Sequence, residues 1–199
     1  MLKRPRAAIG FRVHSGWAAL SAVTGSLAKP QLLLRRRLEL THRSDHSQVQ
    51  PYHAAAEMPL SDAEPFLAEC AQSAAGLARI GIEQTLADLE KRGYRTERSG
   101  LLLSSGRMLG TLAAILASHP AIHTAEGEFF RDAIRRSAES LGLAVTAIRE
   151  KELLSRAGEV LGVSPDEACR HTAQLGKLVG PPWRQDERYA AIAAWLSLL

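Results

Sequence analysis

Two predicted strands end in side chains that could bind an anion. The apolar run 7–14 ends in arginine and histidine, and the run 101–103 is followed by serines and another arginine. Ligands of open α/β sheets bind beyond the carboxyl ends of the parallel strands, so we expect these side chains to gather there with the start of a later helix. The predicted ligand-binding residues are Arg12, His14, Ser104, Ser105, Arg107 and His123. Their cations and hydroxyls suit phosphate better than a bare cation.

Two carboxylates, Glu126 and Glu128, stand at the same predicted helix start. Their charge opposes anion binding. If they pair with Arg12 or Arg107, the set is a structural ion-pair network.

Histidines form two further groups. His42, His46 and His53 lie near Asp45, whereas His119 and His123 are four residues apart around Pro120; such side chains could hold zinc. We expect Pro120 to prevent the helical geometry that would make the second pair converge, and we therefore predict solvated loop residues or local caps and no metal. Ser104-Ser105-Gly106 has only a faint likeness to a nucleophile turn, and no GxGxxG, P-loop or GxSxG motif is present.

Basic residues are concentrated near the start of the chain. The net charge is +4 and the pI is about 9.4, with Arg35, Arg36 and Arg37 in one predicted strand. These three arginines are the predicted nucleic-acid-binding residues, because a basic cluster can contact phosphates. A solvated surface is the alternative, and charges on an edge strand also prevent sheets from pairing with one another.

The elements that must position these residues begin with a three-strand meander over 7–41, with turns at Ser15-Gly16 and 25–30. A long helix follows and ends near Gly93, with Ser61 and Glu64 as a predicted capping box. Later come a buried strand at 101–103 and a helix over 108–118. The next helix is predicted to be capped by Thr124, which places the two glutamates in its first turn. A fifth strand spans 143–148.

Helices fill the rest of the chain, including one capped by Ser164 with Pro165 at its first position and a last helix over 185–199. We expect an α/β domain over residues 1–150 and C-terminal helices over 151–199 that pack on it. The apolar runs are too short for a membrane helix or a signal peptide, so we expect a cytoplasmic protein without a membrane partner.

This order of elements is similar to the ribonuclease H-like fold, and the local signals resemble its branch of RuvC-type Holliday junction resolvases. The residues that carry the resemblance are Ala8 to Arg12 with Gly16 and Trp17, Ala125 to Glu128 with Leu143, Val145 and Glu152, and Gln185 to Ala191. The resemblance implies a mixed five-stranded sheet in the order 3-2-1-4-5, flanked by helices, with a C-terminal helical extension.

The resemblance also locates the residues that would do the family's two-metal chemistry. Arg12 stands at the position of the family's metal-binding aspartate on the first strand, and Ser104 or Ser105 stands at the acidic position of the fourth. In the last helix Asp186 is retained, with Glu187 beside it, while Tyr189 takes the place of a second aspartate.

The resemblance therefore implies a non-catalytic binding or scaffolding module without the usual metal-binding carboxylates, with nucleic acid as its partner through Arg12 and the three arginines at 35–37. The alternative is a divergent metal-dependent nuclease that uses Glu126, Glu128 and Asp186 with Mg²⁺ or Mn²⁺; otherwise no cofactor is expected. An actin-like nucleotide-binding domain is the third hypothesis, although the first turn supplies one glycine and no acid. The oligomeric state, a homodimer included, stays open.

Overall fold

The computed structural model describes all residues except 1–3, 27–28, 43–45, 105–109, 177–178 and 199. The described residues form one five-stranded sheet in the order β3-β2-β1-β4-β5. The strands are β1 (Arg6–His14), β2 (Trp17–Ser26), β3 (Lys29–Glu39), β4 (Arg95–Leu103) and β5 (Ala144–Arg149). The meander is antiparallel, and β4 pairs in parallel with both β1 and β5. This topology confirms the predicted fold class.

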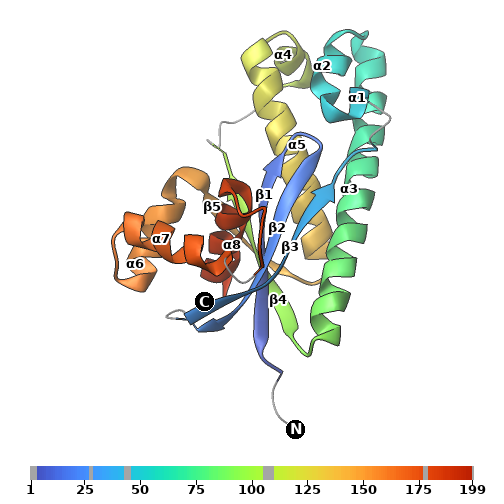
Figure 1. The fold of residues 1–199 in the computed structure, drawn as a ribbon. Coiled ribbons are helices and arrows are strands. Elements are labelled where there is room, and N and C mark those ends of the chain that lie inside the picture. The colour runs from blue at the N-terminus through green and yellow to red at the C-terminus, as the bar shows by residue number, and fades with distance from the viewer. Residues whose placement is uncertain (1–3, 27–28, 43–45, 105–109, 177–178, 199) are drawn as a thin grey trace.

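Helices cover both faces of the sheet and one end of the molecule (Figure 1). They are α1 (His46–Val49), α2 (Pro51–Ala56), α3 (Leu60–Lys91), α4 (Leu112–Leu116), α5 (His119–Ser140), the 3-10 turn η1 (Glu150–Glu152), α6 (Leu153–Leu161), α7 (Pro165–Leu175) and α8 (Gln185–Ser197). None of the helices in the described part of the chain combines the length and the apolarity that crossing a bilayer demands.

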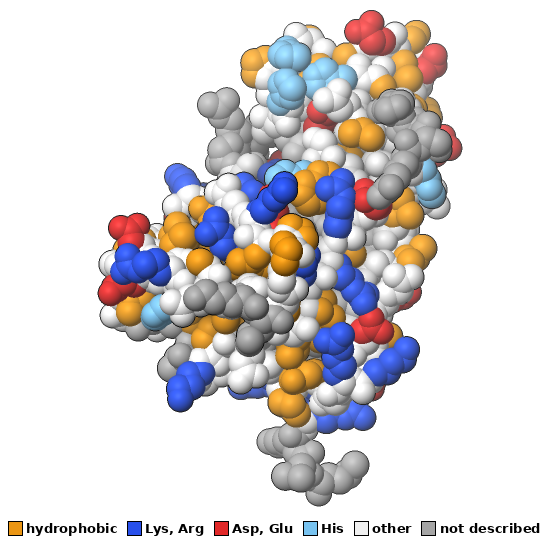
Figure 2. All heavy atoms as spheres, viewed as in Figure 1, with side chains coloured by type: hydrophobic (Ala, Val, Ile, Leu, Met, Phe, Trp, Pro, Cys, Tyr) orange, Lys and Arg blue, Asp and Glu red, His pale blue; other side chains and the backbone are white. Residues whose placement is uncertain are grey.

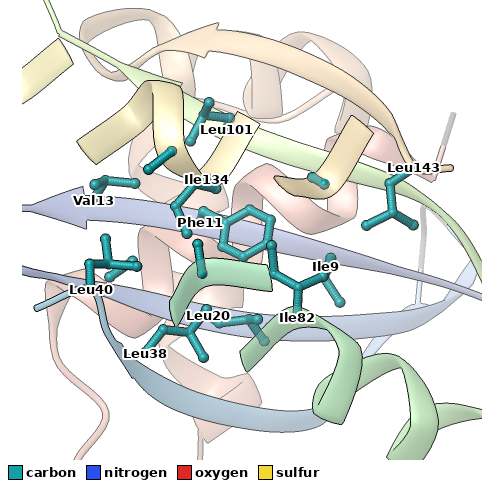
Figure 3. Packing of buried hydrophobic residues seen from close by; sticks show 14 of the residues in the cluster. Ile9, Phe11, Val13, Leu20, Leu38, Leu40, Ile82, Leu101, Ile134 and Leu143 are labelled. Atoms are coloured by element: carbon teal, nitrogen blue, oxygen red, sulfur yellow. The ribbon is translucent and has the colours of Figure 1, made fainter. Parts of the chain in front are cut away.

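The main core lies between the sheet and the pair α3 and α5. Alternate residues of β1 point into it, and Phe11 is fully buried there against Ile82 of α3 and Ile134 of α5 (Figure 3). Burying each such side chain contributes about 1.5–3 kcal/mol. Because side chains of a strand alternate between faces, Gly10 and Arg12 must lie on the opposite face of the sheet.

Helix α8 covers that opposite face and lies directly on the backbone of two paired strands. Gly10 of β1 and Gly100 of β4 are partners in the sheet register. A Cβ at Gly10 would overlap the carbonyl oxygen of Ala190, and one at Gly100 would overlap that of Ala193. The absence of two side chains therefore lets the helix approach closely enough to bring its first turn beside the end of β1.

Two predicted helix caps are wrong. Helix α3 begins after Pro59, so Ser61 lies inside the first turn, where its hydroxyl contacts Asp62 instead of forming a capping box with Glu64. Helix α5 begins at His119, and Thr124 is inside it, with a hydroxyl that donates to the Pro120 carbonyl. Proline fits the first turn because the missing N–H has no helical partner there. The cap at Ser164 and the place of Pro165 at the first position of α7 are confirmed.

Candidate functional site at the sheet rim

The first turn of α8 brings two side chains to the end of β1. Asp186 and Tyr189 are three residues apart and therefore share one face of the helix. The turn is held in place because Ser21 of β2 donates a hydrogen bond of 2.9 Å to the carbonyl oxygen of Glu187. Arg12 lies between this turn and the residue that follows β5, at the carboxyl ends of the parallel strands.

The Arg12 guanidinium binds two carboxylates. Its Nε and Nη2 donate to the two carboxylate oxygens of Glu150 at 3.1 and 2.7 Å, a bidentate arrangement, and its Nη1 donates to Asp186. The Arg12 side chain is 17% exposed, against 36% for Glu150 and 25% for Asp186. The Tyr189 ring centre lies 5.3 Å from the guanidinium carbon, within the range of a cation–π contact.

These contacts shift both members of the Arg12–Asp186 pair toward their charged forms. Burial lowers the pKa of Arg12, but the hydrogen bonds and charges of Glu150 and Asp186 outweigh it, so the pKa lies above its ordinary value. Burial raises the pKa of Asp186, but His14 and Arg12 outweigh it, so that pKa lies below its ordinary value. The pair is therefore fully ionised at neutral pH.

A row of stacked side chains continues from this ion pair across the meander. The Nε2 atom of His14 lies 2.7 Å from Asp186, and the His14 ring stacks on Trp17 at 4.3 Å between ring centres. The Arg37 guanidinium lies 3.9 Å from the centre of a Trp17 ring and donates to Glu39 at 2.9 Å. We call Arg12, His14, Trp17 and Arg37 the rim strip.

A second ion pair lies at the end of β4. The Ser104 hydroxyl donates to Glu128 of α5 at 2.8 Å, and Arg131 donates to the same oxygen at 3.2 Å. Burial lowers the pKa of Arg131, and the charges of Glu128 and Glu150 oppose this shift. The carboxylates of the two clusters, Glu128, Glu150 and Asp186, are thus each bound to a guanidinium.

The structure brings together only part of the predicted ligand set. Arg12, His14, Ser104 and Glu128 reach the rim, whereas Ser105 and Arg107 lie outside the described residues. Glu126 is buried and its contacts are with His53 of α2, and His123 contacts His119. Two residues along a helix turn the direction of a side chain by about 200°. Glu126 therefore points away from Glu128, and the described contacts do not join these two acids with Asp186 into one site.

The predicted arginine cluster is divided between the faces of β3. Arg36 packs toward α3, where it pairs with Asp88 and lies 3.4 Å from Thr85. Arg35 donates to the Pro181 carbonyl at 2.7 Å, and Arg37 belongs to the rim strip. Strand β3 is an edge strand, as the alternative role of these residues requires.

Glu150 and Arg131 were missed by the sequence reasoning. Glu150 directly follows β5, just as the predicted ligand-binding residues follow or end β1 and β4, so it lies at the same edge of the sheet. Arg131 stands three residues after Glu128, the spacing of an ion pair on a helix surface. Both signals were available in the sequence.

The sheet order, its parallel and antiparallel pairings and the flanking helices define a ribonuclease H-like fold of the RuvC type. Two solved structures show this likeness over nearly the whole chain. The structure of Thermus thermophilus RuvC in complex with a Holliday junction substrate has a TM-score of 0.55 and 14% sequence identity, over 96% of this chain and 90% of that one. A further Thermus thermophilus RuvC structure has a TM-score of 0.53 and 14% identity, over 95% and 91%.

No protein-family model matches the sequence. No curated protein matches it either. At 14% identity the likeness to RuvC concerns the fold. The residues at the rim must therefore be interpreted by their own chemistry.

Proposed function

We propose that this domain binds nucleic acid and does not cleave it. The observation that carries the proposal is the position of Arg12, which fills the space between Glu150 and Asp186 and donates hydrogen bonds to both. The RuvC of Thermus thermophilus, which has the same fold, was solved with a Holliday junction substrate. Nucleic acid is therefore the partner class we assign to this chain.

The absence of cleavage follows from how the rim carboxylates are used. Two-metal hydrolysis needs several carboxylates that converge on divalent ions. Here Glu150 and Asp186 are bound by Arg12, and Glu128 is bound by Arg131. A cation would have to displace a guanidinium and would then lie beside its positive charge. The divergent nuclease hypothesis meets the same obstacle, and Glu126 contacts His53 rather than the rim.

The rim strip supplies groups that suit a nucleic-acid backbone. Arg37 is about half exposed, and its guanidinium is held against Trp17. Side chains that are already ordered lose less conformational entropy on binding. Arginine suits phosphate groups because its guanidinium can donate two parallel hydrogen bonds to one phosphate. Figure 2 shows several Lys and Arg side chains spread over this view of the molecule, with fewer Asp and Glu around its centre.

Binding is tested by fluorescence anisotropy with a labelled duplex and a labelled four-way DNA junction over a series of salt concentrations. We expect affinity to fall steeply with salt, because phosphate contacts release counterions. Arg37→Ala should weaken binding and reduce the salt slope by about 1. Arg136→Ala is the matched control, since Arg136 is also exposed and paired with a carboxylate but lies on α5. No binding to either DNA at low salt, or equal effects of the two substitutions, would overturn this part of the proposal.

Cleavage is tested separately with the same junction and millimolar Mg²⁺ or Mn²⁺. We expect intact DNA after incubation. Cleavage that disappears in Asp186→Asn would contradict the proposal and favour the nuclease alternative. Cleavage that persists in that variant would also contradict it and would place the reaction outside this rim.

A further inference from the structure

Three histidines converge at the end of the molecule formed by α2, α4 and the start of α5. His53 comes from α2, and His119 and His123 come from the first turns of α5. One ring nitrogen of each lies within 4.8 Å of the others. Histidine side chains form a group at the top of the view in Figure 2, at the end where Figure 1 labels α2 and α4.

The convergence corrects the expectation that Pro120 would keep His119 and His123 apart. Pro120 occupies the first turn of α5, so the helix runs through both histidines. Residues four apart lie on one face of a helix, and here the two Nε2 atoms are 3.0 Å apart. The His53 ring lies 5.3 Å from the His119 ring and 4.8 Å from the His123 ring, measured between ring centres.

Packing beneath the histidines fixes α2 against α5. Ile122 and Ala125 of α5 form a small apolar cluster with Ile115 of α4, and Tyr52 of α2 packs against it. The helices are therefore held together below the histidines by ordinary hydrophobic contacts.

A buried carboxylate fixes the orientation of His53. The Glu126 side chain is 3% exposed, and its Oε1 atom accepts hydrogen bonds from the His53 backbone N–H at 3.2 Å and from Nδ1 at 2.9 Å. An ionised carboxylate only accepts, so Nδ1 is the donor in this contact, and in the neutral imidazole this tautomer leaves the lone pair on Nε2. Metal-binding histidines usually have this arrangement, in which the second ring nitrogen donates to a carboxylate.

We propose that His53, His119 and His123 bind a zinc ion, with Glu126 as the group that orients His53. Three neutral imidazole nitrogens are typical zinc ligands, whereas magnesium and calcium prefer oxygen. Zinc–nitrogen bonds of about 2.0–2.1 Å in a tetrahedral site place neighbouring nitrogens about 3.3 Å apart. The Nε2 atoms of His119 and His123 are 3.0 Å apart, and one ring nitrogen from each of the three histidines lies within 4.8 Å of the others. Small side-chain rotations would bring these nitrogens to the tetrahedral spacing.

The ion would join α2 to the start of α5. Because His119 and His123 are exposed, the fourth zinc position faces solvent and takes a water molecule. This site is separate from the carboxylates of the rim, and the proposal does not depend on nucleic-acid binding. A metal that binds only the folded state also stabilises it.

The test uses untagged full-length protein, zinc chloride and isothermal titration calorimetry, with thermal unfolding as a second measurement. We expect one zinc per chain and a higher melting temperature with zinc. Glu126→Gln should weaken zinc binding about 10–100-fold, and His119→Ala, which removes a ligand, should weaken it more. Cobalt(II) is a spectroscopic probe: a tetrahedral site gives visible absorption that His119→Ala abolishes.

His42→Ala and His171→Ala are the matched controls, because these histidines are also exposed and lie outside the cluster. Circular dichroism spectra establish that each variant is folded. His123→Ala provides a second ligand variant if His119→Ala fails to fold. The proposal is overturned if the wild-type protein takes up no zinc at sub-millimolar concentrations, or if the controls weaken binding as much as the ligand variants do. The first result would leave His119 and His123 as a hydrogen-bonded pair.

Discussion

Arg12→Ala removes the guanidinium that binds Glu150 and Asp186, and we expect it to destabilise the fold. The three hydrogen bonds involved are charge-assisted and largely shielded, since the Arg12 side chain is 17% exposed. Removing one partner of a fully buried ion pair costs about 3–5 kcal/mol, and an exposed pair contributes about 0.2–1 kcal/mol. The partners here are 36% and 25% exposed, so we expect a loss of about 2 kcal/mol.

The assay is urea unfolding followed by circular dichroism, with thermal unfolding in parallel. For a chain of this size, about 2 kcal/mol corresponds to a melting temperature lower by about 4–8 °C. Arg37→Ala is the control, because Arg37 is exposed and its contacts among the described residues are with Glu39 and Trp17; we expect a loss below about 1 kcal/mol. Adding Asp186→Asn to Arg12→Ala should recover part of the stability by removing one of the two carboxylate charges that lose their guanidinium partner. Equal stability of Arg12→Ala and wild type would refute the view that this ion pair is a structural unit.

Three further predictions concern the rim and the contact between α8 and the sheet. Arg12→Asp would place a third carboxylate beside the existing two, and calorimetry should detect Mn²⁺ binding there that the wild type lacks. Gly100→Ala would push a Cβ into the backbone of α8 and should cost more than about 3 kcal/mol or prevent folding, whereas Gly76→Ala, in open space on α3, should stabilise by about 0.5–1 kcal/mol. Because the pKa of Asp186 is lowered in the folded state, its ionised form stabilises the fold above about pH 4. This stabilisation is lost as the pH falls below about 4 through the lowered pKa of Asp186. The Asp186→Asn variant should therefore show a smaller decrease in stability over that acidic range.

Much of the fold could be predicted because its signals are local. Alternating and apolar runs locate the meander, and the fifth strand lies within one residue of its predicted bounds. The pattern also predicts the long helix α3. The capping errors at Ser61 and Thr124 arise because the sequence motif for a cap does not reveal where the helix begins. A proline one residue inside the first turn marks the start of α5 at His119, and the same residue was interpreted as a break.

The site was harder to predict because its contacts join distant parts of the chain. Arg12 and Asp186 were both candidate residues, but their pairing depends on where α8 lies, and that position is set by Gly10 and Gly100 in the middle of the sheet. Likewise, Glu126 and His123 were assigned to the rim because α5 was expected to start near Thr124. The observed cap, Ser118, is six residues earlier than the predicted one, and this moves both residues to later turns, where they contact His53 of α2.

The place of α8 in the fold has a consequence for biosynthesis. Its residues, Gln185–Ser197, are made long after β1, yet they cover the apolar surface around Val23 and Leu102. Contacts between such distant segments form slowly, and exposed sheet surfaces promote aggregation. Before Gln185 has been synthesised, this face of the sheet lacks its covering helix, and we expect the nascent chain to be most prone to aggregation during that interval.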